Sequence, residues 1–360
     1  MQITHQSDRI ALDEFLKVRV DSVRKNRKWD RRDFPKNDPC ALQRWQSDFR
    51  VEFSRLLGGV TDWDCLPLNA HIIESRKCDG YIRETVHFET QSGMVVNAYF
   101  LIPDGCTAPR PAMLCLPGHG RGVDTLVGIA VDGSERPMGE PEEYAGDFAL
   151  QCVAHGFPTL AMEMIGFGER RTLSARSASA DVSSCHAAAT TALALGETLA
   201  GWRVFDAMRA LDYLQSRTEV VCPEKIGIMG ISGGAMIALF TAALDERISA
   251  TVLSCYWNSF ADSILSLVHC VDNYIPGLSK LCEMSDLAAL VAPRSLFAES
   301  GSTDIIFPVE AFRESCIHAR DIYKEFGAPV GFQSEEFVGG HEFHGVQAFE
   351  FLSRWQSGSD

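Results

Sequence analysis

Residues 225–240 read KIGIMGISGGAMIALF, an apolar run that is interrupted by a serine between glycines. The first six residues are typical of a short buried strand, and the residues after the serine are typical of a buried helix. Ser232 stands at the junction in the pattern G-x-S-x-G, from Gly230 to Gly234. Glycines tolerate a strained turn and a close approach of neighbouring backbone. The segment therefore predicts a strand, a sharp turn that exposes the serine hydroxyl above a sheet, and a helix.

Short apolar strands recur on both sides of this segment. The first two, YIRETVHFET and GMVVNAYFLIP, are separated by QSG and predict a hairpin. Later strands alternate with helical runs, the longest being TTALALGETLAGWRVFDAMRALDYLQSR at residues 190–217. This alternation predicts an α/β fold, with a mostly parallel central sheet and helices on both faces. Functional residues of such sheets lie at the carboxyl ends of the strands.

The first 78 residues differ from the rest of the chain. RIALDEFLKVRV and ALQRWQSDFRVEFSRLLGG carry apolar residues at helical spacing, with Pro35 and Pro39 between them. We expect residues 1–78 to form a helical N-terminal extension on a catalytic domain of residues 79–360. The N-terminus lacks the uninterrupted apolar core and the small-residue cleavage site of a signal peptide.

Composition excludes several classes of protein. The 360 residues carry a net charge of −15, so no basic field is available to bind nucleic acid. No stretch reaches the roughly 18 apolar residues of a membrane-spanning helix. The twelve cysteines form no C-x-x-C pair and, without an export signal, indicate reduced thiols. We expect a cytoplasmic enzyme with no nucleic acid or membrane partner, and association into a homo-oligomer is left open.

A serine nucleophile needs a base, and the base needs an acid that orients it. On a fold of this kind the chain order is serine, acid, histidine. After Ser232, Asp304 follows the strand in LFAESGSTDIIFP, and His341 follows the strand in FVGGHEFHG. We predict that these three residues are nucleophile, acid and base.

Both partners of the serine have a rival nearby. Glu299 ends the strand before Asp304 but lies a few residues early, and His344 follows His341 where the last helix begins. A His-x-x-His pair can also bind a metal. However, no cysteine or third histidine is grouped near it in the sequence, and acyl transfer already accounts for the histidine. We expect neither a metal nor a cofactor.

The oxyanion that forms on an attacked ester needs hydrogen-bond donors. The first expected donor is the N–H of Gly233, the residue after the nucleophile. The second is expected in the glycine-rich loop of CLPGHGRG. Position in that loop favours the N–H of His119, with Gly120 and Arg121 as alternatives.

Residues 80–355 resemble an α/β-hydrolase, in particular the acetyl xylan esterase-like and dienelactone hydrolase-like branch. The resemblance rests on LPGHGRG, EMIGFGERR, GIMGISGGA, ALDERISATVLSC, HCVDNYIPGL, APRSLFAESGSTDIIFPV and GGHEFHG. It implies an α/β-hydrolase fold, a triad of Ser232, Asp304 and His341, and PGH as the oxyanion loop. The better-known acetyl xylan esterases carry glutamine after the nucleophile, where this chain has Gly233, and dienelactone hydrolases use cysteine. These departures weaken the transfer of either substrate.

A lid insertion is expected at about residues 256–290, after the strand ISATVLSC, where such folds place lid elements. Glu163 and Arg171, after the strand PTLAMEM, are expected to form a buried ion pair near the site or to contact the substrate. Ordinary packing is an open alternative for every candidate cleft residue. The candidates are Tyr256, Trp257, His269, Asn273, Tyr274, Glu163 and Arg171.

The leading interpretation is a serine carboxylic ester hydrolase that acts on small acyl esters, with acetylated sugars among the candidates. One alternative is a serine peptidase of the prolyl-oligopeptidase type, which usually has a bulky residue after the serine and a propeller domain. Another is a catalytically silent binding protein with a hydrolase fold. The order of Ser232, Asp304 and His341 argues against the silent protein.

Overall fold

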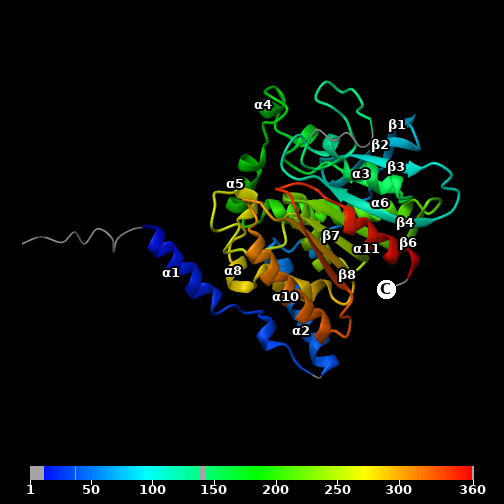
Figure 1. Cartoon of the computed structure of the whole chain (residues 1–360). Coiled ribbons are helices and arrows are strands. Elements are labelled where there is room, and N and C mark those ends of the chain that lie inside the picture. Colours follow the sequence, from blue (N-terminus) through cyan, green and yellow to red (C-terminus); the bar gives the residue numbers. More distant parts are fainter. Residues whose placement is uncertain (1–11, 37, 138–142, 359–360) are drawn as a thin grey trace, which may run out of the picture.

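The computed structural model describes residues 12–36, 38–137 and 143–358 (Figure 1). Within these residues a nine-stranded sheet has the order β1-β2-β3-β5-β4-β6-β7-β8-β9. Three pairs are antiparallel: β1 with β2, β2 with β3, and β3 with β5. All the other pairs are parallel. The mostly parallel sheet and the hairpin of its second and third strands are confirmed. The strands are β1 (His71–Lys77), β2 (Tyr81–Gln91), β3 (Met94–Pro103), β4 (Arg110–Leu116), β5 (Thr159–Met162), β6 (Val221–Ile231), β7 (Ile248–Ser254), β8 (Ser295–Gly301) and β9 (Phe332–Phe337).

Helices cover both faces of the sheet, because successive strand residues point to opposite sides. On β4, Ala112 and Leu114 belong to the core that α6, α7 and α10 cover, while Met113 and Cys115 belong to the core that α3 and α11 cover. No helix in the described part of the chain is long and apolar enough to cross a membrane. The helices are α1 (Leu12–Arg24), α2 (Pro39–Leu56), α3 (Phe148–Ala154), α4 (Leu173–Arg176), α5 (Cys185–Leu195), α6 (Leu199–Ser216), α7 (Gly233–Leu244), α8 (Leu278–Leu281), α9 (Ala288–Val291), α10 (Val309–Glu325) and α11 (Val346–Ser357).

The N-terminal extension contains the two expected helices, α1 and α2, but the sheet begins inside residues 1–78. β1 pairs with β2 at the edge of the sheet, and every one of its side chains is exposed. A strand with no buried face shows no alternation of apolar and polar residues, so the sequence gives no signal for it. α2 packs on the body through buried residues that include Phe49 and Phe53.

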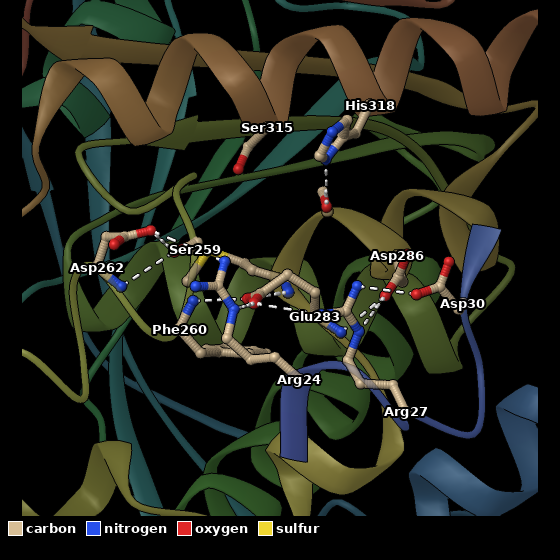
Figure 2. A network of polar contacts seen from close by, with 12 residues as sticks. Arg24, Arg27, Asp30, Ser259, Phe260, Asp262, Glu283, Asp286, Ser315 and His318 are labelled. Carbon is tan, nitrogen blue, oxygen red and sulfur yellow. Dashed lines mark hydrogen bonds and ion pairs between the residues drawn. The ribbon is translucent and has the colours of Figure 1, made fainter. Parts of the chain in front are cut away.

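Charged side chains connect the end of α1 to the lid insertion (Figure 2). Arg24 lies 4.0 Å from the carboxylate of Asp262 and 3.7 Å from that of Glu283. Arg27 lies 3.4 Å from Asp286, a carboxylate whose side chain is buried. The N-terminal extension therefore supports the insertion that the sequence places beside the site.

Candidate active site

Ser232 occupies a strained turn between β6 and α7. Its backbone angles are φ 53° and ψ −122°, a conformation that non-glycine residues rarely adopt. The neighbouring glycines permit it, because a Cβ at Gly230 would lie 2.4 Å from the backbone of Gly234, and one at Gly234 would lie 2.2 Å from the carbonyl oxygen of Leu116. The N–H of Ser232 donates to the carbonyl of Ser254 at 2.9 Å, which ties the turn to the end of β7. The strand, turn and helix expected from the sequence are all present.

Asp304 and His341 are joined by a hydrogen bond. His341 Nδ1 donates to Asp304 Oδ2 at 2.7 Å, and Asp304 Oδ1 accepts the N–H groups of Ile306 and Phe307 at 2.8 and 3.1 Å. Burial raises the pKa of Asp304, but these hydrogen bonds and the nearby imidazole outweigh it and hold the pKa below its ordinary value. The ionised carboxylate fixes the proton on Nδ1, so Nε2 is the atom that can accept a proton.

Aromatic rings hold the imidazole of His341 over the sheet. Tyr144 and Phe307 stack on it, with ring centroids 5.5 and 5.7 Å away. The thiol of Cys255, directly after β7, lies within 4.8 Å of the polar atoms of Asp304 and His341. His341 is thus placed at the carboxyl end of β7, the strand to which Ser232 is bonded. Among the described residues no hydrogen bond joins Ser232 Oγ to His341, and such bonds often tighten only with substrate.

The two rival residues have other partners. Glu299 is fully buried and accepts hydrogen bonds from Ser254 Oγ at 2.8 Å and from the N–H groups of His344 and Gly345 at 3.0 Å each. His344 Nδ1 lies 3.1 Å from Glu335. Glu299 therefore holds the backbone of the loop after His341, and His344 faces a different carboxylate.

The two residues predicted to supply the oxyanion donors lie side by side. The N–H of Gly233 is in the first turn of α7, where the helix has no carbonyl to accept it. A Cβ at Gly233 would lie 2.8 Å from His119 Nδ1, so the imidazole of His119 covers this residue. The carbonyl of His119 accepts the hydroxyl of Tyr144 at 2.8 Å. Tyr144 therefore connects the oxyanion loop to the ring of His341.

A buried ion pair anchors the side chain of His119. Its Nε2 donates to Asp272 at 3.0 Å, and Asp272 also accepts Arg203 Nη1 at 2.5 Å. The side chains of Asp272 and Arg203 are both 0% exposed. Burial opposes the charge on His119, but hydrogen bonds to Asp272 and Cys185 and the charge of Asp272 raise the pKa of His119 to about 9.

Two thiols complete this cluster. The donor atoms of His119, Cys185, Cys270 and Asp272 lie within 4.8 Å of one another, a set that would suit a soft divalent metal. However, Arg203 Nη2 lies 2.9 Å from Cys185 Sγ and Arg203 Nη1 binds Asp272. A guanidinium thus already supplies the positive charge, and we assign these groups to a hydrogen-bonded network. All twelve cysteines are free thiols, as the sequence predicts.

Comparison with known proteins assigns the chain to a family. The sequence profile of the Abhydrolase family (Abhydrolase_7) matches residues 16–315. The chain belongs to the Abhydrolase family. It is also similar to YtaP of Bacillus subtilis (strain 168), a protein named as a hydrolase, with 27% identity over 318 residues that cover 86% of this chain and 99% of YtaP. Ser232 and Asp304 lie inside the segment that matches the Abhydrolase family, and His341 lies beyond it.

Solved structures similar to this Abhydrolase family member share its fold. A protein of Bacteroides fragilis NCTC 9343 named as an acetyl xylan esterase has a TM-score of 0.78 and 18% identity, over 97% of this chain and 96% of that chain. A glucuronoyl esterase of Solibacter usitatus has a TM-score of 0.63 and 15% identity, over 89% and 94%. The α/β-hydrolase fold and the resemblance to the acetyl xylan esterase-like branch are confirmed.

The predicted ion pair of Glu163 and Arg171 is wrong. The guanidinium of Arg171 donates to backbone carbonyls, including that of Ser179 at 2.8 Å. The preceding residue, Arg170, is the one that turns inward, and it binds Asp206 at 2.6 Å. Glu163 is buried and bonds no side-chain cation among the described residues, and burial raises its pKa to about 8.

Two of the aromatic cleft candidates of this Abhydrolase family member lie in its core. Trp257 is 0% exposed and packs on Phe332 at 5.9 Å, so the packing alternative is correct for it. Tyr256 is buried behind Phe307, with ring centroids 5.4 Å apart, and Phe307 in turn stacks on His341. Tyr256 supports the site from behind.

The other candidates of the lid insertion lie nearer to the predicted chemistry. His269 is half-buried, its ring lies 5.9 Å from that of Phe307, and its Nε2 has no hydrogen-bond partner among the described residues. Burial lowers the pKa of His269, which favours the neutral ring. Asn273 Nδ2 donates to Asp272 at 3.0 Å, and the hydroxyl of Tyr274 donates to a backbone carbonyl within the insertion.

Sequence reasoning missed four residues that shape this site: Tyr144, Cys255, Arg203 and Asp272. Arg203 offered one signal, because it is a charged residue among the buried positions of α6, and such a residue needs a partner. The partner, Asp272, comes from a segment 69 positions away. Nothing in the local sequence joins the two.

Proposed function

We propose that this Abhydrolase family member is a serine carboxylic ester hydrolase that acts on esters of small acyl groups. The observation that carries the proposal is the 2.7 Å hydrogen bond between Asp304 and His341, close to the strained turn of Ser232. Family membership supports hydrolysis as the class of reaction. The esterases with the same fold support an ester as the substrate.

The proposed reaction proceeds through an acyl-enzyme. His341 Nε2 takes the proton of Ser232 as Oγ attacks the ester carbon, and Asp304 stabilises the imidazolium that results. The N–H groups of Gly233 and His119 receive the oxyanion. His341 then returns the proton to the leaving alcohol, and it activates the water that releases the acid. No step requires a cofactor.

The composition of the lid insertion favours a short acyl group. A long acyl chain needs an apolar lining, since each methylene removed from water contributes about 0.8 kcal/mol. Polar residues and a proline interrupt the insertion: Asp262, His269, Asp272, Asn273 and Pro276. Acetyl to butyryl esters are therefore the proposed range, and acetylated sugars, which release a sugar hydroxyl as the alcohol, are the proposed natural substrates.

A series of p-nitrophenyl esters from acetyl to dodecanoyl tests the proposal, with Ser232→Ala as the matched variant. We expect kcat/KM to be highest for the shortest acyl groups, and Ser232→Ala to lose on the order of 10⁶ in turnover while it keeps the circular dichroism of the wild type. Turnover by folded Ser232→Ala would exclude this nucleophile. Rates that rise toward dodecanoyl would exclude the small-acyl preference, and cleavage of peptide p-nitroanilides instead of esters would favour a peptidase.

A further inference from the structure

The imidazole of His119 has one nitrogen bonded to a carboxylate and the other beside Gly233. Nε2 is bonded to Asp272. The opposite nitrogen, Nδ1, and the adjoining ring carbon lie 2.8 and 2.9 Å from the position that a Cβ of Gly233 would take. Gly233 is the residue whose N–H is the expected oxyanion donor. The side chain of His119 therefore lies beside the residue that is expected to bind the oxyanion.

The absence of a side chain at position 233 makes this contact possible. Any residue other than glycine would place its Cβ 2.8 Å from Nδ1 of His119, closer than the two atoms can approach unless something shifts. Gly233 is also the position at which this chain departs from the better-known acetyl xylan esterases, which carry glutamine there. In this chain the imidazole of His119 occupies the space that a side chain after the nucleophile would fill.

The proton on Nδ1 decides what this imidazole can do. Because Nε2 donates to the carboxylate of Asp272, the neutral ring would present a lone pair at Nδ1, which repels an oxyanion. The imidazolium presents an N–H at the same place, and hydrogen bonds from charged donors are about twice as strong as neutral ones. The protonated ring is therefore the form that can stabilise the transition state.

We infer that His119 is a catalytic residue, and that its imidazolium donates a hydrogen bond from Nδ1 to the oxyanion of the ester. The inference rests on the proposed function, because it assumes that Ser232 attacks a carbonyl. It adds a charged donor to the two backbone N–H groups. Asp272 and Arg203 are positioning residues that act through His119.

The surroundings of His119 keep it protonated at neutral pH. Asp272 comes from the lid insertion, Arg203 from α6 and Cys185 from the start of α5, while His269 interacts with the ring from the lid side. Burial and the charge of Arg203 oppose a positive charge on His119. The carboxylate of Asp272 and the thiol of Cys185 favour it, and the pKa of His119 stands at about 9.

A hydrogen bond from Cys270 and the charge of Arg203 contribute to this balance. They lower the pKa of Cys185 to about 5 despite burial, so the neighbour of His119 is a thiolate. The pKa of Asp272 is held well below its ordinary value, because Arg203 and His119 outweigh burial. The imidazolium therefore faces two anions and one guanidinium, and it loses its proton only as the pH rises through about 9.

The test is the rate at which a fluorophosphonate labels Ser232 between pH 6 and 10.5. This reaction forms charge on a phosphoryl oxygen and does not depend on the natural ester. We expect wild-type labelling to fall as the pH rises through about 9, where His119 loses its proton.

His119→Gln keeps an N–H donor and loses the charge, so its labelling should be slower by on the order of 10² at pH 7 and lack the alkaline decline. His87→Gln, on β2 far from the site, is the control and should match the wild type.

Asp272→Asn distinguishes the electrostatic role from a structural one. Without the carboxylate, the pKa of His119 should fall, and the alkaline decline should move to lower pH. Thermal unfolding of each variant identifies any loss of folding, and titration of the His119 ring by NMR measures its pKa independently of labelling. A wild-type rate and alkaline decline in folded His119→Gln would overturn the inference, as would a His119 that is neutral at pH 7. Ester turnover is scored separately, so labelling without turnover contradicts the proposed function alone.

Discussion

Two histidine–aspartate pairs flank Ser232, and they are built differently. In the first, Asp304 binds Nδ1 of His341, and its other oxygen accepts two backbone N–H groups. In the second, Asp272 binds Nε2 of His119 and also accepts a hydrogen bond from the fully buried guanidinium of Arg203. Both carboxylates are buried, and both have a pKa below the ordinary value.

Each aspartate fixes a proton on the ring nitrogen that it binds. The protonation of the ring then decides whether the other nitrogen offers a lone pair or an N–H to the site. His341 has a carboxylate and two stacked rings as neighbours and is suited to exchange a proton with the nucleophile. His119 has Asp272 and the thiolate of Cys185 beside it, which hold its proton firmly. In the proposed mechanism the same pair of residue types supplies a base on one side of Ser232 and a positive charge on the other.

The largest expected effect comes from removal of the base. His341→Ala should lose on the order of 10⁶ in kcat, as the loss of a serine-enzyme histidine does. His344→Ala should remain within about tenfold of the wild type, because His344 faces Glu335. Hydrolysis of p-nitrophenyl acetate by the two purified variants measures the contrast. A dead His344→Ala beside an active His341→Ala would reverse the assignment of the base.

The orienting acid should have the next largest effect. Asp304→Asn removes the carboxylate that fixes Nδ1 of His341, and kcat should fall by up to about 10⁴. Glu299→Gln keeps one oxygen that can accept one of the two N–H groups of the His341 loop and does not touch the carboxylate of Asp304, so its loss should be less than about 10². Equal kcat values for the two variants, both checked for folding, would contradict the choice of Asp304.

The smallest effect is expected at Glu163, a third buried acid, which bonds no side-chain cation in the part of the chain that the structure describes. Glu163 accepts the N–H of Val123 at 3.2 Å and has a pKa raised to about 8 by burial. Its folded-state pKa exceeds the unfolded value of about 4.3. The stability that Glu163 contributes is therefore fully present below the unfolded pKa of about 4.3. It is lost as the pH rises through the folded pKa of about 8.

Glu163→Gln should remove this dependence. The amide resembles the protonated acid, so the variant should gain about 3 kcal/mol in the free energy of unfolding relative to the wild type between pH 6 and 9, because the wild type loses about 1.4 kcal/mol per pH unit between pH 6 and its pKa of about 8. Urea unfolding at the two pH values measures the difference, and Glu169→Gln, on the exposed surface of the same loop, is the control. Parallel pH profiles for Glu163→Gln and the wild type would exclude a raised pKa.

The sheet could be predicted from the sequence because its strands are short apolar runs with clear turn residues. Ser232 was recognisable because its glycines stand between a strand and a helix, a local pattern that survives without tertiary information. β1 escaped prediction because its exposed side chains carry no periodicity. The expected helical extension through residue 78 therefore ended too late.

The site was predictable only where chain order carried the information. Asp304 and His341 follow consecutive parallel strands, and the order of strands brings their loops together. The ion pair assigned to Glu163 and Arg171 failed because side-chain direction within an irregular loop cannot be read from spacing. The cluster around His119 was missed because its members come from four segments that only the fold brings together.

The contact between Gly233 and the ring of His119 has a consequence for the order in which this site can change. Gly233→Gln alone would force its side chain into the imidazole, whereas the same substitution after His119→Gly would enter an empty space. The two positions are thus epistatic. Only the order that changes residue 119 first avoids an intermediate in which the side chain of residue 233 clashes with the imidazole. A laboratory evolution experiment that aims at the glutamine arrangement should begin at residue 119.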